Sequence, residues 1–408
     1  MDVFIARRPI FDRMNRVFGY KLVHSSLSEP SSDENSFDSA LQLIDNSLLV
    51  FDLETLSGGK KLFFTFTNEA LDSGCAELLP KAHVVIDLHP SVSEDEKVVA
   101  QCRELRSAGY DICAPVFGAT DVSKSLVELA NLVSLDFQLV ADPRIRRMFT
   151  FGGFSDKVLL SRSIDSLEDL EAAKKLGCHY FEGEFFSKPP MVASRDLPGL
   201  KPNFLRLLRA LSDPEPDFGK VADIIAREVS LTYKLLRLVN SAASGLSNRV
   251  TSIDRALMLI GARGLRQWAA VIVVAELSSS APAELICCSA VRGRFCQLIG
   301  EALGLTSYAQ DLFLMGLFSL LDVIAQRPMP LLLNDLELEG PARDALENGR
   351  GDFRPILDLV VAYEQARWDV VAEQGATIGL PLHRLPGLYV PAVEWADVSS
   401  GAAAGVAA

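Results

Sequence analysis

The stretch YFEGEFFSKPP, residues 180–190, marks the change in sequence pattern that decides the fold. Its first residues are typical of a short strand, and the two prolines that end it hold the backbone extended and remove N–H donors. Before this stretch, strand-like runs alternate with helix-like runs; after it, the pattern is helical. We therefore expect YFEGEFFSKPP to be the last strand of an amino-terminal α/β domain.

Strand and helix patterns alternate over residues 1–190. The apolar, β-branched run HVVIDLH (83–89) is typical of a buried strand, and Ser93 and Glu96 after it predict a capping box at the start of a helix. Repeated strand-then-helix units predict parallel strands, either in a barrel or in an open doubly wound sheet. No GxGxxG or GxxxxGK(S/T) follows a strand, so a dinucleotide-binding fold and a P-loop have no support.

The second half of the chain has a different pattern. Residues 191–200 are rich in proline and predict a linker, residues 201–398 carry apolar positions at helical spacing, and residues 399–408 predict a disordered tail. A chain of 408 residues is too long for one ordinary core. We therefore expect two domains, an α/β domain followed by an all-α domain.

Composition limits the classes of function. The formal net charge of −13 opposes loose attraction to nucleic acid or to an anionic membrane surface. No run of about 18 apolar residues is present, and the start of the chain lacks the apolar core of a signal peptide. We therefore expect a cytoplasmic protein without a membrane span. The seven cysteines form no CxxC pair and are expected to be buried free thiols.

The strand-ending stretch FEGEFFSKP (181–189) resembles the FQGYFFSKP end of an EAL domain, a TIM-like barrel that hydrolyses cyclic di-GMP. Further segments resemble the family's motifs in sequence order: ARRPIFDRMNRVFGYKLVHS (6–25), KLFFTFTNEAL (61–71), VVIDLHP (84–90), APVFG (114–118), VSLD (133–136) and SRSID (161–165). The resemblance implies an EAL-like barrel over residues 1–190.

The helical half resembles an HDOD domain. REVSLTYKLLRLVNSA (227–242) and TSIDRALMLIGARGLRQW (251–268) follow that family's pattern, and AYEQARWD (362–369) resembles the version found in tandem EAL–HDOD signal-transduction proteins. The resemblance implies a TIM-like barrel followed by an α-helical HDOD bundle over residues 201–398.

The resemblance also implies a metal site that this sequence does not complete. EAL domains use one or two Mg²⁺ or Mn²⁺ ions, which need several oxygen ligands at the strand ends. The family's site positions align here with Lys21, Thr65, Pro90, Pro115, Val116, Ser134, Arg162, Asp165 and Glu182. Only Asp165 keeps a ligand of the right chemistry. We therefore expect no metal, no cofactor and no enzymatic activity.

Binding without hydrolysis is the alternative. Arg7, Arg8, Lys21 and Arg162 have the charge to hold a phosphate. Such cations are more often solvated or salt-bridged at the surface, and Ser25 stands where the family has an arginine suited to phosphate. We expect binding of cyclic di-GMP to be weak or absent.

The remaining acids near the strand ends have structural uses. Asp87 and Asp136 are expected to accept hydrogen bonds from backbone or hydroxyl donors, and Asp165 to pair with Lys21 or Arg162 where the metal would have been. A new catalytic centre built from these acids is disfavoured.

The helical half also lacks the residues for a hydrolytic metal site. Its only histidine is His383, and Ser319 stands where related HD phosphohydrolases place a histidine, which leaves Asp322 for capping or pairing. Three further residues resemble structural positions of the HDOD family: Asn240, Ser241 and Gly261. We expect Asn240 to brace a helix junction and Gly261 to permit a positive φ or a close approach.

The sequence thus predicts a non-catalytic bacterial signalling scaffold that acts through contacts with other signalling proteins, with a homodimer as one option. Its link to cyclic di-GMP, motility or biofilm regulation is implied by the resemblance alone, since fold does not fix function. A non-hydrolysing cyclic di-GMP receptor is the alternative.

Overall fold

The structure, a computed structural model, describes residues 3–26, 53–116, 123–150, 154, 156–187, 206–207, 209–211, 216–241, 249–277 and 282–404. The chain divides into two compact units. The first comprises Met1–Lys188, Val361–Ala376 and Pro381–Val390, and the second comprises Pro189–Val360, Thr377–Leu380 and Pro391–Ala408. The linker predicted at 191–200 lies outside the described residues.

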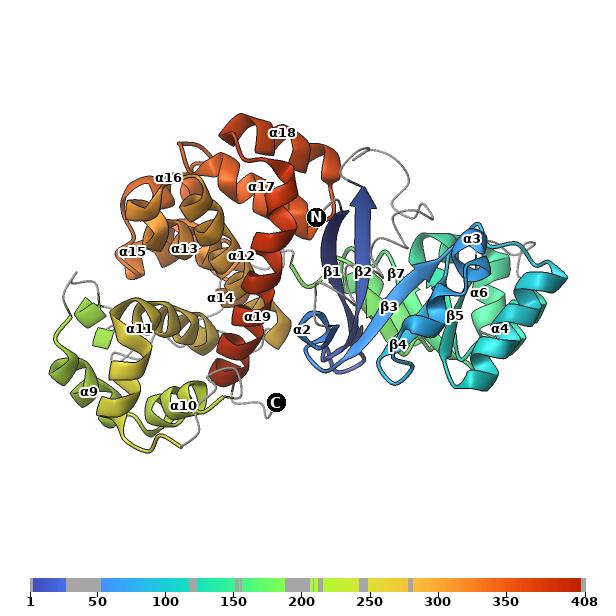
Figure 1. Ribbon diagram of the computed structural model, residues 1–408, viewed down its shortest axis with the longest axis horizontal. Coiled ribbons are helices and arrows are strands. Elements are labelled where there is room, and N and C mark those ends of the chain that lie inside the picture. Colours follow the sequence, from blue (N-terminus) through green and yellow to red (C-terminus); the bar gives the residue numbers. More distant parts are fainter. Residues whose placement is uncertain are drawn as a thin grey trace. The chain divides into compact units, whose positions relative to one another are not determined.

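The first unit is a closed eight-stranded barrel in the order β1 to β8 (Figure 1). The strands are β1 (Val3–Asp12), β2 (Val17–Ser26), β3 (Lys61–Phe66), β4 (Val84–Leu88), β5 (Asp111–Val116), β6 (Leu132–Asp136), β7 (Val158–Arg162) and β8 (Tyr180–Glu182). β1 runs antiparallel to both of its neighbours, and all other pairs are parallel. The prediction of a TIM-like barrel is confirmed, and the open sheet is excluded.

Each barrel strand alternates between two apolar cores. Outward residues join a large cluster with the surrounding helices, and a smaller inner cluster is formed by Ile10, Phe63, Val85, Cys113, Leu132 and Leu160. Because side chains alternate along a strand, the residue two positions after each inner-core residue also faces inward. This register brings the carboxyl-terminal residues of the parallel strands β2 to β8 to one end of the barrel.

The helices of the barrel are α2 (Leu53–Ser57), α3 (Asn68–Asp72), α4 (Glu96–Ala108), α5 (Lys124–Leu129), α6 (Pro143–Thr150) and α7 (Leu167–Lys175). The capping box predicted for Ser93 and Glu96 is wrong, because Asp95 is the N-cap of α4 and accepts a hydrogen bond from the Val98 N–H at 2.9 Å. Ser93 instead donates to the Asp95 carboxylate at 2.8 Å.

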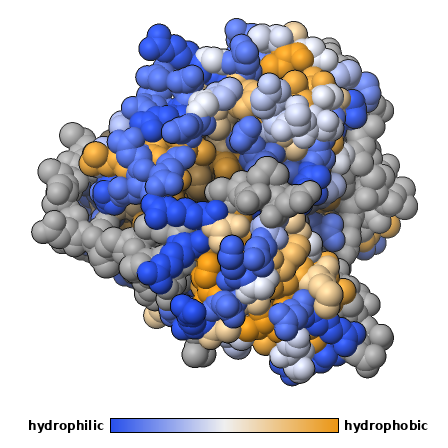
Figure 2. All heavy atoms as spheres, turned by 90° about the vertical axis from the view of Figure 1, so that its left-hand side faces the viewer, coloured by the Kyte–Doolittle hydropathy of each residue, from blue (hydrophilic) through white to orange (hydrophobic). Residues whose placement is uncertain are grey.

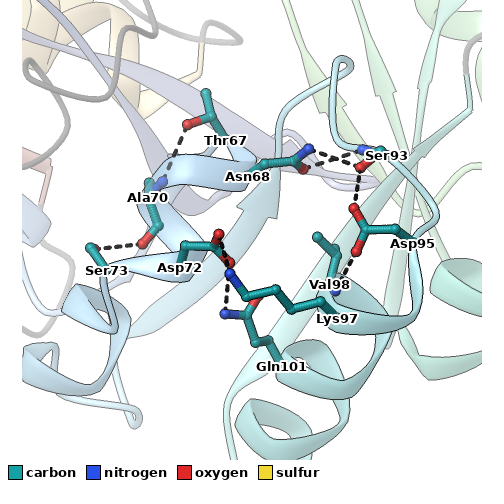
Figure 3. A network of polar contacts seen from close by, with 10 residues as sticks. All are labelled: Thr67, Asn68, Ala70, Asp72, Ser73, Ser93, Asp95, Lys97, Val98 and Gln101. Atoms are coloured by element: carbon teal, nitrogen blue, oxygen red, sulfur yellow. Dashed lines mark hydrogen bonds and ion pairs between the residues drawn. The ribbon is translucent and has the colours of Figure 1, made fainter.

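A polar network joins the segments that follow β3 and β4 (Figure 3). Asn68 Nδ2 donates to Ser93 Oγ at 2.9 Å, and the Ser93 N–H donates to Asn68 Oδ1 at 3.2 Å. On the next turns, Asp72 of α3 accepts from Lys97 and Gln101 of α4. These bonds fix the segments after β3 and β4, at the carboxyl ends of these strands, relative to each other.

Residues late in the chain also pack on the barrel. They belong to α17 (Arg354–Glu364), α18 (Trp368–Ile378) and α19 (Leu385–Ala404), which the sequence placed in the helical domain. Trp368 stacks on Phe4 of β1 with ring centroids 4.9 Å apart, and Figure 1 shows α17 and α18 beside the amino-terminal end of β1. The first unit is therefore completed by residues that follow the second unit's main helices.

The second unit is helical. It contains α9 (Phe218–Ala226), α10 (Val229–Val239), α11 (Ile253–Leu277), α12 (Ala283–Ala302), α13 (Ala309–Phe318), α14 (Leu321–Ala325), α15 (Met329–Asp335) and α16 (Gly340–Glu347). The helices α12 and α13 approach closely at Gly316, where an added Cβ would lie 2.4 Å from the Arg292 carbonyl oxygen.

The helix α11 is bent and largely buried. Gly261 has φ of 69° and ψ of 171°, which separates two helical segments within it. By length and composition, α11 is the one helix among the described residues that is apolar enough to cross a membrane. Its segment after the bend, from Leu265 to Val274, is mostly buried among the other helices, as is usual for a core helix.

The expected disordered tail differs in part from the structure. Residues 399–404 continue α19, and Ser399, Ser400 and Ala403 are buried. The alanine-rich composition of this segment favours a helix, and packing supplies the stability that such a short segment lacks alone. Residues 405–408 lie outside the described part of the chain.

Candidate functional site

A cavity of about 300 Å³ opens at the carboxyl ends of the barrel strands. This end carries the ligand and catalytic residues in TIM-like barrels. The lining includes most of the positions that aligned with the family's metal ligands: Lys21, Thr65, Pro90, Pro115, Val116, Ser134 and Arg162. Thr65, Pro115, Ser134 and Arg162 each lie two residues after an inner-core residue of the same strand, which is why they meet here.

Arg162 bridges two carboxylates at the base of this cavity. Its Nη2 donates to Asp87 Oδ1 at 2.7 Å, and its Nη1 donates to Glu182 Oε2 at 2.8 Å. The three side chains come from β7, β4 and β8, and only 15%, 4% and 8% of their surfaces are exposed. Two short charge-assisted hydrogen bonds thus cross-link three strands in a poorly solvated setting.

The charges of this triad support one another. Burial alone would lower the pKa of Arg162, but Asp87 and Glu182 outweigh burial and raise it above its ordinary value. Burial alone would raise the pKa of Glu182, but Arg162, Lys21 and Arg8 together lower it below its ordinary value. Both shifts favour the charged forms of Arg162 and Glu182, and removal of Arg162 would leave buried carboxylates without their cation.

Two polar groups of the cavity have no partner among the described residues. Lys21 forms no ion pair or hydrogen bond with them, and the buried Thr65 hydroxyl has no hydrogen-bond partner there. An unpaired cation beside an unsatisfied hydroxyl favours an anionic ligand with oxygen acceptors.

The residues present do not fit the divalent metal ion that the barrel family implies. No group of three His, Cys, Asp or Glu side chains that could hold a metal occurs in the described parts of the chain. The carboxylates that line the cavity are Asp87 and Asp136; Arg162 already pairs with Asp87 and with Glu182, and Asp136 accepts from the Gln138 N–H. A divalent cation in this place would meet the fixed positive charges of Arg162 and Lys21.

Asp165 corrects the prediction of a retained ligand. It is exposed, it does not line the cavity, and Arg162 pairs with Asp87 and Glu182 in place of Asp165. The strand β7 ends at Arg162, so Asp165 lies in the segment beyond the strand end. Asp136 behaves as expected, because it accepts from the Gln138 N–H at 3.0 Å.

Arg7 and Arg8 do not line the cavity, and Arg7 is buried whereas Arg8 is partly exposed. Arg7 lies over the Tyr20 ring at 4.3 Å and donates to the Leu56 carbonyl. Arg8 donates to the Gln365 carbonyl at 2.7 Å. Their predicted role as direct phosphate ligands is therefore not supported by the geometry.

The structure adds residues that the sequence did not single out as site residues. His89 and Ser163 line the cavity, and Asp87 does so as a partner of Arg162 rather than of a backbone donor. Ser163 has φ of 57°, a left-handed conformation that is uncommon outside glycine and often marks a functional site. The sequence could have indicated Asp87, because it is the one acidic residue in the otherwise apolar strand β4.

The predicted HDOD positions take part in local hydrogen bonding. The Asn240 side chain donates to the Leu236 and Val250 carbonyls and accepts from the Val250 N–H, which joins the end of α10 to the start of the next segment. Ser319 donates to the Gly316 carbonyl and accepts from Arg292, and the Asp322 carboxylate accepts from the Val323 N–H. Ser241 donates its N–H to the Leu238 carbonyl.

Comparisons place these features among known proteins. Residues 197–326 match the family model of the HDOD domain. YuxH of Bacillus subtilis, an uncharacterized protein, is 28% identical over 406 residues, which covers 97% of this chain and 98% of YuxH. The cyclic di-GMP phosphodiesterase CdgJ of Vibrio cholerae is 24% identical over 400 residues, which covers 97% of this chain and 92% of CdgJ.

Solved structures are similar to the barrel. The YkuI protein of Bacillus subtilis, which has an EAL domain and is in complex with cyclic di-GMP and calcium, is 18% identical with a TM-score of 0.38. The match covers 65% of this chain and 72% of YkuI.

The expectation that the chain is not an enzyme is contradicted by these relatives. CdgJ matches the chain almost end to end and is a phosphodiesterase. Missing family ligands at individual positions therefore do not establish that catalysis is lost.

Proposed function

We propose that this chain, an EAL–HDOD signalling protein linked to cyclic di-GMP, binds the dinucleotide at the mouth of its barrel and acts through protein contacts of its helical half. The observation that carries the proposal is a cavity at the carboxyl ends of the strands, lined by Arg162, by Lys21 and by the Thr65 hydroxyl, the last two without a side-chain partner among the described residues. These groups match the phosphate of a cyclic dinucleotide in charge and in hydrogen-bonding capacity.

Weak or absent binding of cyclic di-GMP was expected because such cations are usually solvated or salt-bridged at the surface. Arg162 is 15% exposed and faces the cavity, and Lys21 lines it as well. The cavity is lined by the cations Lys21 and Arg162 and by the carboxylates Asp87 and Asp136, and Arg162 is held by Asp87 and Glu182. Lys21 has no ion pair among the described residues, and a cation in a poorly solvated cavity attracts an anion more strongly than the same charge at the surface.

The helical half has apolar side chains available for protein contacts. Tyr233 of α10 and Met258 and Leu259 of α11 are exposed. Figure 2 shows apolar surface between hydrophilic regions on the face that it presents. Exposed apolar groups of this kind support contacts with partner proteins, which the HDOD architecture is proposed to make.

Calorimetric titration of the full chain with cyclic di-GMP tests the binding. We expect a saturable heat, and in Lys21→Met an affinity lower by about tenfold or more, since a charge-assisted hydrogen bond contributes about 1.5–3 kcal/mol. Lys60→Met is the matched control, because Lys60 is exposed in a turn and does not line the cavity.

Two results would contradict the proposal: no heat with the unmodified chain at millimolar ligand, or equal affinity in the Lys21→Met and Lys60→Met variants. The same samples are then incubated with Mn²⁺ and the products separated by chromatography. Because CdgJ is a phosphodiesterase, a linear dinucleotide in this assay would add a reaction to the binding proposed.

A further inference from the structure

β1 extends beyond the residues that pair it with β8. The strands β1 and β2 have 10 residues each, but β8 has 3 and pairs only with Ile10, Phe11 and Asp12 of β1. Backbone groups of β1 nearer the mouth therefore have no strand partner on this side. Unpaired edge groups of this kind need another partner when they are buried.

Residues 361–390 supply these partners. The Ile5 N–H donates to the Tyr363 hydroxyl and the Arg7 N–H to the Tyr389 hydroxyl, each at 3.3 Å. Both tyrosines are buried. The end of α17 and the start of α19 thus cover the open edge of β1 at the mouth side of the barrel.

Arg8 connects this cover to the barrel interior. Arg8 Nη2 donates to the Gln365 carbonyl at 2.7 Å. Gln365 directly follows the last residue of α17, and the chain turns at Ala366, whose φ is 54°, with the Arg367 N–H bonded to the Ala362 carbonyl. The Gln365 carbonyl is therefore at a helix carboxyl end, where the helix dipole favours a cation.

The other side of Arg8 faces the cavity charges. Arg8 is the register partner of Lys21, which lines the cavity, and it lies two residues from Ile10, an inner-core residue paired with Glu182. Directly opposed and alternate residues share a face of the sheet. Arg8 is also one of the cations that lower the pKa of Glu182, the carboxylate that holds Arg162.

We infer that Arg8 is a positioning residue that couples occupancy of the barrel mouth to the carboxyl end of α17. The inference rests on the proposed binding of cyclic di-GMP. A phosphate that draws Arg162 and Lys21 changes the electrostatic field at Glu182, which also acts on the charge of Arg8, and the Arg8 guanidinium is hydrogen-bonded to the helix end. Because coupling is reciprocal, a change at the carboxyl end of α17 changes the affinity of the cavity for the dinucleotide.

Hydrogen exchange with and without cyclic di-GMP, read by mass spectrometry on the full chain, tests the inference. We expect the ligand to change the exchange rate of amides 361–368 by about fivefold, at the lower end of typical coupling. In Arg8→Gln, this ligand-induced difference disappears and the affinity measured by calorimetry falls. Arg8→Lys restores part of the affinity, because it keeps the charge but not the forked donor geometry.

Arg13→Gln is the matched control. Arg13 also donates to carbonyls at a helix end, those of Lys174 and Cys178 after α7, and it does not line the cavity. We expect its ligand-induced exchange at 361–368 to equal that of the unmodified chain. A purely structural role of Arg8 would alter exchange without ligand but leave the ligand-induced difference in place.

The outcomes separate the two proposals. If the unmodified chain gives no binding heat, both the binding and the coupling are overturned. If it binds but amides 361–368 do not respond, or if Arg8→Gln responds as the unmodified chain does, the coupling alone is overturned.

Discussion

Replacing Arg162 by methionine tests the central feature of the barrel mouth, its buried charge triad. The substitution keeps much of the side-chain volume but leaves Asp87 and Glu182, with 4% and 8% of their side chains exposed, without their cation. Removing one partner of a buried ion pair costs about 3–5 kcal/mol of folding free energy. We therefore expect a loss of this size, measured by urea unfolding with pulse hydrogen exchange on peptides of β4, β7 and β8.

The pH dependence of the free energy of unfolding gives an independent check of this stability loss. In the unmodified chain, the pKa of Glu182 lies below its ordinary value of 4.5, so its contribution to stability is present above about pH 4.5 and is lost as pH falls through the lowered pKa. Without Arg162, burial outweighs the remaining cations and shifts the pKa of Glu182 upward. The stability deficit of Arg162→Met is therefore largest at pH 7 and shrinks as the pH falls toward 4.

Two further variants serve as controls for the stability measurement on Arg162→Met. Arg16→Met removes an exposed arginine from its pair with Asp12 and should change stability by about 1 kcal/mol or less. Combining Arg162→Met with Asp87→Asn and Glu182→Gln removes all three charges and should recover most of the loss. The reasoning is refuted if Arg162→Met is as stable as Arg16→Met, or if its deficit grows as the pH falls.

Three other outcomes are expected. Mn²⁺ or EDTA should leave the thermal midpoint of the unligated chain unchanged, since the described donors do not fit a divalent ion; a shift of several degrees with Mn²⁺ would contradict this. Gly316→Ala should destabilise the helical unit by about 1–3 kcal/mol because its Cβ meets the Arg292 carbonyl, whereas Gly401→Ala, which has open space, should not. Burial lowers the pKa of His24 to about 4 from 6.5, so up to about 3 kcal/mol of stability should be lost between these pH values in titrated urea melts, and His24→Leu should abolish that slope.

Binding of cyclic di-GMP and its hydrolysis are different properties of the cavity at the carboxyl ends of the strands. Lys21, Thr65 and Arg162 are the groups proposed to hold a phosphate, and no group of three metal-ligating side chains is found among the described residues. CdgJ carries out hydrolysis and matches nearly the whole chain. Measuring affinity and turnover on the same samples therefore reports separately on recognition and on chemistry.

The order of strands and helices was readable from the sequence, because hydrophobic periodicity and turn residues are local signals. The run HVVIDLH predicted a buried strand, and the strand β4 occupies it. Resemblance at the strand ends also identified Lys21, Thr65, Pro115, Ser134 and Arg162 as neighbours, since parallel strands bring equivalent ends together. These inferences need only the pattern along each strand.

Tertiary structure alone decided which charges meet. Arg162 pairs with Asp87, 75 residues away, and Arg8 with the carbonyl of Gln365, 357 residues away. Such pairs depend on barrel closure, strand register and the return of α17 to the edge of β1, and no local periodicity encodes them. Asp165, which was expected to pair with Lys21 or Arg162, lies three residues beyond the end of β7 and does not line the cavity, and Arg162 pairs with Asp87 and Glu182 instead.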